Sequence, residues 1–206
     1  MTTTAIAPAD ISLAVSFDGG STPEVDYMFG IGLDKTSDAV YFQYLGDDES
    51  RAFVFDNGKP VTRFSNVRVT GLSIIKLDNE FNQNKLNLFL ENQQGRTILL
   101  TSGLQTLWSQ CVVTGLMGLL ESFSLDSLIN LDTWKGTSKL RPCFAGIRNN
   151  GIKVVSEEVK TQLNLAEKDQ REKIMRDSVE IISRALEIVP VVVTDSSIAG
   201  TSTDSF

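Results

Sequence analysis

The sequence predicts a β-rich α+β fold, mainly β, in which one helix interrupts the strands and a long helix follows them. Short segments that alternate apolar and polar residues fill most of residues 11–155, and turn residues separate them, a pattern typical of half-buried strands. Residues 104–121 instead repeat apolar side chains at intervals of three and four, the period of an amphipathic helix. Residues 156–188 contain no glycine or proline and favour a second helix.

The N-terminal part is expected to contain strands joined by short turns. These strands are predicted at 11–17, 27–33, 39–45 and 51–56. Asn57-Gly58 follows them and is the strongest two-residue hairpin signal in the chain.

The middle of the chain predicts three strands, a helix and two further strands. The strands are expected at 63–77, 85–91 and 96–102 before the helix and at 128–134 and 140–148 after it. Gly71 lies inside the first of them and indicates a bulge or a sharp bend. Trp108 belongs to the apolar stripe of the helix, so we expect it in the core. Asn149-Asn150-Gly151 closes the hairpin that follows the last strand.

We therefore expect three regions. Residues 1–155 form a β-rich domain that combines acidic N-terminal strands (1–60) with a barrel-like part (61–155). Residues 156–189 form a long C-terminal helix, whose apolar side could serve oligomerisation. Residues 190–206 are rich in serine and threonine and are expected to be a flexible tail.

Charge is unevenly distributed along the chain, whose net charge is −7. Residues 1–50 carry one basic and nine acidic residues, a balance of −8, and residues 154–206 carry six and ten, a balance of −4. Residues 51–153 carry twelve basic and seven acidic residues, a balance of +5. A basic middle permits a polyanion-binding face on an acidic protein, although charges that are merely solvated would give the same count.

The residue types argue against most catalytic and metal-binding chemistry. The chain has no histidine, which excludes Ser-His-Asp and Cys-His nucleophile systems and histidine-bound zinc. Gly30-Ile31-Gly32 lacks the third glycine and the following helix of a dinucleotide site. Asp47-Asp48-Glu49 could hold a divalent cation, but a solvated turn explains it more simply. Glu158-Val159-Lys160 has the Glu-x-Lys spacing of metal-dependent nucleases, but it opens a helix instead of lying on a strand.

We therefore expect no enzymatic activity, no cofactor and no metal site. The first residues lack the basic flank and apolar run of a signal peptide, and no apolar run approaches the roughly 18 residues of a membrane span. The expected location is the cytoplasm. Cys111, on the apolar stripe of the helix, and Cys143, in a strand, suit buried free thiols there.

The residues that fit a binding role are cations and aromatics of the middle segment. Single-stranded nucleic acid is bound by a cationic groove together with aromatic rings on which bases stack. The candidate cations are Arg68, Lys76, Lys85, Arg96, Lys135, Lys139, Arg141 and Arg148. The candidate stacking surfaces are Phe89, Trp134 and Phe144. Each of these three rings could instead pack in a core or under neighbouring strands.

The order of these elements is that of an OB-fold barrel, with a three-strand meander, a helix and two more strands. In such folds nucleic acid lies across the second and third strands and the loops beside them. We therefore expect the fold to be an OB-fold-like barrel with extra N-terminal strands.

One resemblance supports this expectation. The element order, the Trp134-Lys135-Gly136 turn, the Arg141-Pro142-Cys143-Phe144 segment and the acidic tail ending in Phe206 resemble single-stranded-DNA-binding proteins of the OB-fold type, especially those of phages and plasmids. The resemblance covers residues 60–155 and the last dozen. It implies a non-enzymatic, sequence-tolerant protein of replication, recombination or repair that forms a homo-oligomer. It also implies that the tail, with Asp204 and Phe206, recruits replication partners.

Two other classes of function remain open at this stage. A structural or assembly subunit, such as a virion or filament component, would use its strands and its C-terminal helix for protein contacts, with Phe89 and Trp134 as interface anchors. An enzyme built on carboxylates and a metal would have to lose its activity on chelation and on Asp47→Ala.

Overall fold

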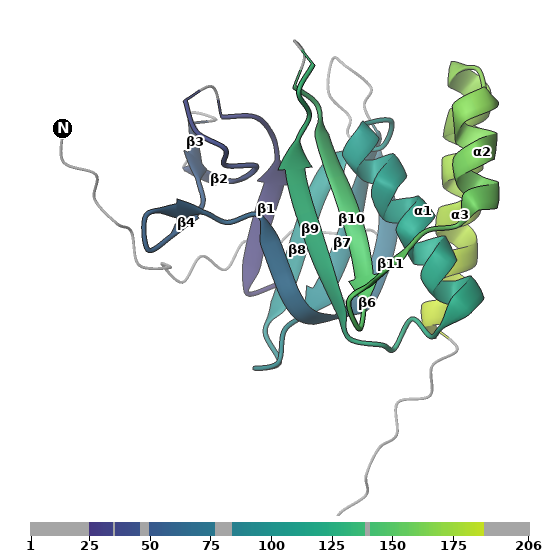
Figure 1. Cartoon of the computed structure of the whole chain (residues 1–206), viewed down its shortest axis with the longest axis horizontal. Coiled ribbons are helices and arrows are strands. Elements are labelled where there is room, and N and C mark those ends of the chain that lie inside the picture. The colour runs from purple at the N-terminus through teal and green to yellow at the C-terminus, as the bar shows by residue number, and fades with distance from the viewer. Residues whose placement is uncertain (1–24, 35, 46–49, 77–83, 139–140, 188–206) are drawn as a thin grey trace, which may run out of the picture.

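The computed structural model describes residues 25–34, 36–45, 50–76, 84–138 and 141–187 of the 206-residue chain (Figure 1). These residues form a mainly β structure with three helices, so the predicted β-rich α+β class is confirmed. The expected strand at 11–17, the Asp47-Asp48-Glu49 tip and the tail at 190–206 lie outside the described residues. Within the described part, no helix is long and apolar enough to cross a membrane.

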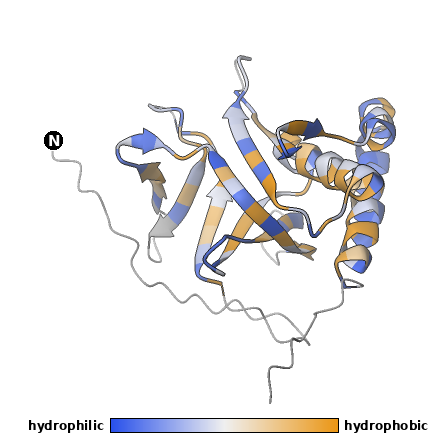
Figure 2. Cartoon of the chain, turned by 60° about the horizontal axis from the view of Figure 1, so that its bottom comes forward, coloured by the Kyte–Doolittle hydropathy of each residue, from blue (hydrophilic) through white to orange (hydrophobic). Residues whose placement is uncertain are grey.

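The elements follow the expected order. The strands before the first helix are β1 (Tyr27–Ile31), β2 (Tyr41–Leu45), β3 (Ser50–Phe53), β4 (Phe55–Asp56), β5 (Lys59–Pro60), β6 (Arg63–Lys76), β7 (Asn84–Glu91) and β8 (Thr97–Gly103). The elements after it are α1 (Leu107–Ser122), β9 (Ile129–Lys135), β10 (Cys143–Asn149), β11 (Ile152–Val154), α2 (Glu157–Leu165) and α3 (Lys168–Glu187). Figure 2 shows apolar and polar residues alternating along the long strands, as the period of two predicts.

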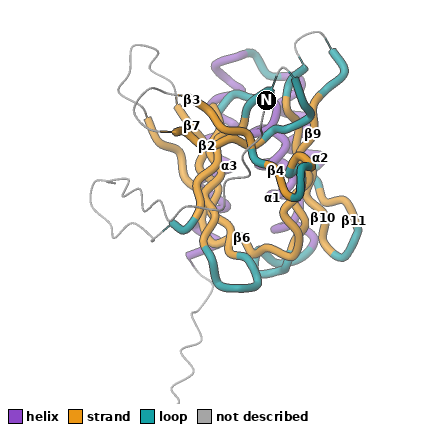
Figure 3. Tube along the Cα trace, turned by 90° about the vertical axis from the view of Figure 1, so that its left-hand side faces the viewer, coloured by secondary structure: helices purple, strands orange, loops and turns teal. Residues whose placement is uncertain are grey.

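Nine of the described strands form one mixed sheet in the order β11-β10-β9-β6-β7-β8-β1-β2-β3. The strands β9-β6-β7-β8 form a Greek key, because the fourth strand of that segment returns to lie beside the first. Strand β1 pairs with β8 in parallel, so the N-terminal strands continue the same sheet. Viewed end-on, the sheet bends at β6 into two arms, with β7 and β2 in one and β9 to β11 in the other (Figure 3).

Local turn chemistry is confirmed at three places. Asn57 and Gly58 both have positive φ, as the two-residue hairpin between β4 and β5 requires, and Asn150 and Gly151 repeat this between β10 and β11. The register of β6 against β7 shifts between Val69 and Gly71, which is the bulge expected there.

The single C-terminal helix expected over 156–189 is wrong, because the structure has two helices with Ala166 extended between them. The break satisfies the last carbonyls of α2 without a glycine. The Arg171 guanidinium donates to the carbonyl of Leu163 at 3.2 Å and to that of Ala166 at 2.9 Å. At the start of α3, the backbone N–H of Glu167 donates to the side chain of Gln170. These side-chain bonds stabilise a break of two residues between α2 and α3 that the composition did not predict.

The core lies between the two arms of the sheet and is covered by α1 and α3. Trp108 is fully buried, so its predicted core position is confirmed. Its indole N–H donates to the Thr133 hydroxyl at 3.0 Å, and the Tyr41 hydroxyl lies 2.6 Å from the same oxygen. Burial raises the pKa of the Tyr41 phenol. One buried hydroxyl on β9 thus joins β2, α1 and β9.

Candidate functional site

The outer face of β9 and β10 carries an exposed pair of aromatic rings. Trp134 and Phe144 lie directly opposite each other in the two strands, and their rings stack with centroids 6.1 Å apart and planes 19° from parallel. A Cβ on Gly146 would lie 3.2 Å from the indole of Trp134, so the indole lies flat across a position without a side chain. Because 45% of Trp134 is exposed, one large aromatic surface faces solvent.

Three cations share this face. Arg148 lies opposite Lys153 of β11 and Asn130 of β9. Its guanidinium bonds the Asp132 carboxylate at 3.3 Å, and the Arg63 guanidinium, from β6, bonds the other oxygen of that carboxylate. Three cations against one carboxylate leave the face net positive. We call Trp134, Phe144, Arg63, Arg148 and Lys153 the aromatic–basic face.

The ion pairs on this face are exposed enough to exchange partners. The side chains of Arg63 and Arg148 are about half exposed. Exposed pairs of this kind contribute only about 0 to 1 kcal/mol each. A phosphate can therefore replace the carboxylate at either guanidinium at small cost, and guanidinium binds phosphate in a bidentate manner.

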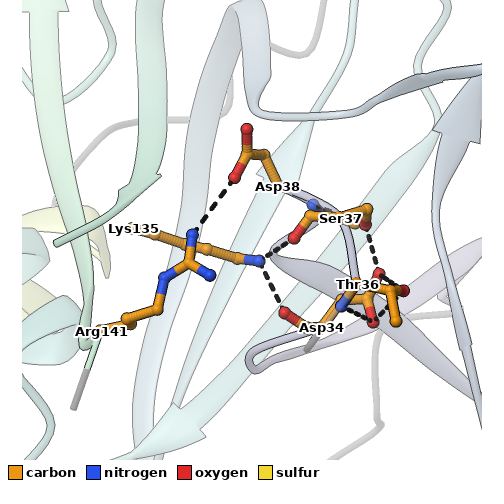
Figure 4. Close-up of polar contacts among 7 residues, drawn as sticks. Asp34, Thr36, Ser37, Asp38, Lys135 and Arg141 are labelled. Carbon is orange, nitrogen blue, oxygen red and sulfur yellow. Dashed lines mark hydrogen bonds and ion pairs between the residues drawn. The ribbon is translucent and has the colours of Figure 1, made fainter. Parts of the chain in front are cut away.

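Two of the predicted cations hold a loop instead of facing solvent freely. The Lys135 ammonium donates to the backbone carbonyl of Asp34 at 2.8 Å and also to that of Ser37, and Arg141 pairs with Asp38 at 3.5 Å (Figure 4). These contacts join the end of β9 and the residues just before β10 to the connection between β1 and β2, and we call them the clasp.

The loop side of the clasp is itself ordered by hydrogen bonds. The Asp34 carboxylate accepts from the Ser37 hydroxyl and from the backbone N–H of Thr36 at 3.1 Å. The bond from Ser37 is the main reason why the pKa of Asp34 lies below its usual value. The clasp also lies near Cys143, whose thiol is 3.5 Å from the Gly32 carbonyl and whose pKa is raised by burial. Both cysteines are free and half-buried.

The prediction that Phe89 offers an exposed stacking surface is wrong. Phe89 of β7 is only 8% exposed, and its neighbours Asn87, Leu99 and Thr101 on the same side of β7 and β8 are buried as well. The ring of Phe89 therefore offers no free surface to a base in this structure. Lys85, on the same side, is half-buried, and burial together with the nearby Arg51 charge lowers its pKa.

The remaining predicted cations are spread over the molecule. Arg96 bonds Asp26 at 2.6 Å, and this bond is the main cause of the lowered pKa of Asp26. Arg68 lies 3.9 Å from Asp126, and Lys76 is exposed at the end of β6. Lys139, Asp204 and Phe206 lie outside the described residues. Of the eleven residues predicted to bind nucleic acid, the structure thus brings Trp134, Phe144 and Arg148 together on one face.

Sequence reasoning missed Arg63 and Lys153. The hairpin signal at Asn150-Gly151 could have found Lys153, because a two-residue turn there places 153 opposite 148. Arg63 had no such signal, since the register of β6 against β9 shifts between Phe64 and Val67.

Comparison with known proteins does not assign a function to this site. No family model, no curated protein and no solved structure matches the chain. Among the residues that the structure describes, no group of three or more cysteine or carboxylate side chains could hold a metal ion.

Proposed function

We propose that this protein binds single-stranded nucleic acid, most simply DNA, without catalysis and without strict sequence preference, through the aromatic–basic face. The observation that carries the proposal is the stacked Trp134–Phe144 pair, which is exposed beside two arginines and a lysine. Exposed aromatic rings are costly to leave in water and give every base the same stacking surface, which makes binding tolerant of sequence.

The face suits a single strand of nucleic acid that runs along β10. Phe144 and Arg148 are four residues apart, which corresponds to about 13 Å along a strand. A base stacked on Trp134 would leave the backbone of the nucleic acid within reach of Arg148 and Lys153. Each base stacked on an aromatic ring contributes about 1 to 3 kcal/mol. Phosphate contacts add affinity that falls steeply with salt.

The strand order supports this proposal. The Greek key of β6 to β9, with α1 between its third and fourth strands and β10 beside β9, resembles the strand order of an OB-fold. The described sheet is open, because β8 pairs with β1 and not with β10. We therefore propose an OB-like fold in which β1 to β3 extend the sheet beyond β8. A cytoplasmic, oligomeric protein of replication, recombination or repair, with a tail that recruits partners, follows from the resemblance to OB-fold proteins and belongs to the same proposal.

A fluorescence titration with oligo-dT tests the proposal. Trp134 is exposed and Trp108 is buried, so bound bases should quench the emission of Trp134 and leave that of Trp108. We expect saturable quenching at about 50 mM salt that weakens strongly by about 300 mM, because released counterions drive the binding. An emission spectrum unchanged by oligo-dT at the lower salt would contradict the proposal.

One observation favours an assembly subunit as the second candidate. Large apolar side chains are exposed on the helical side of the molecule, namely Leu165, Ile181 and, on the neighbouring hairpin, Ile152. Such side chains are typical anchors of protein interfaces. A large homo-oligomer that ignores nucleic acid, measured by light scattering with and without oligo-dT, would favour this second function.

A further inference from the structure

Strand β10 has an edge that no described strand covers along its first half. On one side β9 pairs with all of Cys143–Asn149. On the other side β11 pairs only with Ile147, Arg148 and Asn149. The edge of residues 143–146 that points away from β9 is therefore unpaired within the part of the chain that the structure describes.

The hydrogen-bonding groups on this edge can be assigned from the register. The carbonyl of Pro142 accepts from the Gly136 N–H, so residue 142 bonds toward β9. Residues along an antiparallel strand bond alternately to one neighbour and to the other. The N–H and C=O groups of Cys143 and Ala145 therefore point to the unpaired edge, as those of Ile147 and Asn149 point to β11.

An apolar cleft of about 220 Å³ adjoins this edge, between α1 and α2. Leu107 and Cys111 of α1, Leu163 of α2 and Ile147 of β10 line it. Its volume is below the roughly 300 to 1,000 Å³ of typical small-molecule sites. The cleft therefore fits an apolar side chain of a bound peptide better than a metabolite.

Two lysines give the cleft a positive charge. Lys153 of β11 and Lys160 of α2 line it, and both are exposed. Lys160 also bonds Glu157 at 2.9 Å on the surface of α2, whereas Lys153 has no ion-pair partner among the described residues. An occupant with carboxylates beside its apolar residues would complement this charge.

We propose that the edge of β10 and this cleft form a docking site for an extended acidic segment of a partner protein. The segment adds to β10 as a strand and exchanges hydrogen bonds with Cys143 and Ala145. One apolar side chain enters the cleft, and carboxylates reach Lys153 and Lys160. Addition of a strand to a free sheet edge is a recurring mode of peptide recognition, in which the main chain gives affinity and the pocket gives specificity. This site goes beyond nucleic-acid binding and does not depend on it, although Lys153 belongs to both sites.

The test is an NMR titration of the ¹⁵N-labelled full chain with a nine-residue peptide that alternates glutamate and valine. Its control is the same peptide with lysine in place of every glutamate. We expect the acidic peptide to shift the amides of 143–147 and Lys153 saturably below about 1 mM. The lysine peptide should bind at least about ten-fold more weakly, which corresponds to about 1.4 kcal/mol.

Charge-reversal variants separate this site from general attraction of anions. The double variant Lys153→Glu with Lys160→Glu should weaken the acidic peptide at least about ten-fold. The matched variant Lys168→Glu with Lys173→Glu, on exposed lysines of α3 away from the cleft, should bind it as the unmodified chain does.

Three results would overturn the proposal. The first is equal or absent shifts with both peptides. The second is a shift of the same amides with protein concentration alone, which would make a second copy the occupant. The third is unchanged affinity of the acidic peptide for the double variant Lys153→Glu with Lys160→Glu. Loss of oligo-dT binding with intact peptide binding would leave this site standing and remove only the proposed function.

Discussion

Replacing Thr133 by valine should destabilise the protein far more than the small change in side-chain size suggests. Valine has nearly the shape of threonine, so the change leaves no cavity. It removes the hydroxyl that accepts from the Trp108 indole at 3.0 Å and lies 2.6 Å from the Tyr41 hydroxyl. All three side chains are buried, so water cannot replace the lost partner.

The magnitude follows from the two groups left without a partner. A buried donor that loses its only partner costs about 1 to 3 kcal/mol. With two such groups we expect Thr133→Val to lower the free energy of unfolding by about 2 to 5 kcal/mol, a large share of the stability of an ordinary domain. Thr133→Ser keeps the hydroxyl and loses one methyl, which costs about 1 kcal/mol.

Urea unfolding followed by circular dichroism measures both variants, since the midpoint and slope together give the free energy of unfolding. The expected order of stability is the unmodified chain, then Thr133→Ser, then Thr133→Val. If the valine variant were as stable as the serine variant, the shared hydroxyl would not join β2, α1 and β9, and the account of the core would fail.

Three further predictions concern the surface. Asp132→Asn removes the carboxylate that bonds both Arg63 and Arg148 on the aromatic–basic face. The affinity for oligo-dT, measured by fluorescence anisotropy, should therefore rise about three- to ten-fold at 50 mM salt, and the gain should shrink at high salt. Unchanged affinity would contradict the site. Lys135→Ala should speed hydrogen exchange in the loop of residues 32–40 and lower the free energy of unfolding in urea by about 1 to 2 kcal/mol. Arg141→Ala should lower it by less than about 1 kcal/mol. Equal effects of the two variants would refute the clasp. The pKa of Glu172 lies below its usual value of 4.5, chiefly because Arg176 bonds it. Its contribution to stability is therefore present above about pH 4.5 and is lost as pH falls through the pKa of the folded state. Glu172→Gln should reduce the loss of unfolding free energy between pH 5 and pH 3, and an unchanged pH profile would contradict this role of Glu172.

The alternation of apolar and polar residues, together with the turn residues, predicted most of the strand order, because these signals are local. The hairpins at Asn57-Gly58 and Asn150-Gly151 need positive φ, and asparagine and glycine are the residue types that adopt it most readily. The bulge at Gly71 and the buried Trp108 follow in the same way from one residue in a periodic segment. The two helices at 157–187 did not, because the break at Ala166 depends on side-chain bonds from Arg171 and not on a glycine or proline.

The candidate site was only partly predictable, because alternation reports the polarity of a strand face and not what lies over it. Asn87 and Phe89 alternate with Leu86, Leu88 and Leu90 of the core, yet both are buried as well. The role of Lys135 depends on carbonyls about 100 positions earlier in the chain, and no local sequence pattern predicts such a contact. Trp134 and Phe144 were found as separate candidates, and their stacking needed the register of β9 on β10.

The most direct test of the central claim compares Trp134→Ala with Phe89→Leu in their affinity for a labelled oligo-dT, measured by anisotropy at about 50 mM salt. If the aromatic–basic face binds single strands, the alanine variant should lose about five- to 150-fold in affinity, which corresponds to the 1 to 3 kcal/mol of one stacked base. The leucine variant, changed at a buried ring, should bind as the unmodified chain does. Full affinity in the Trp134→Ala variant would contradict the account.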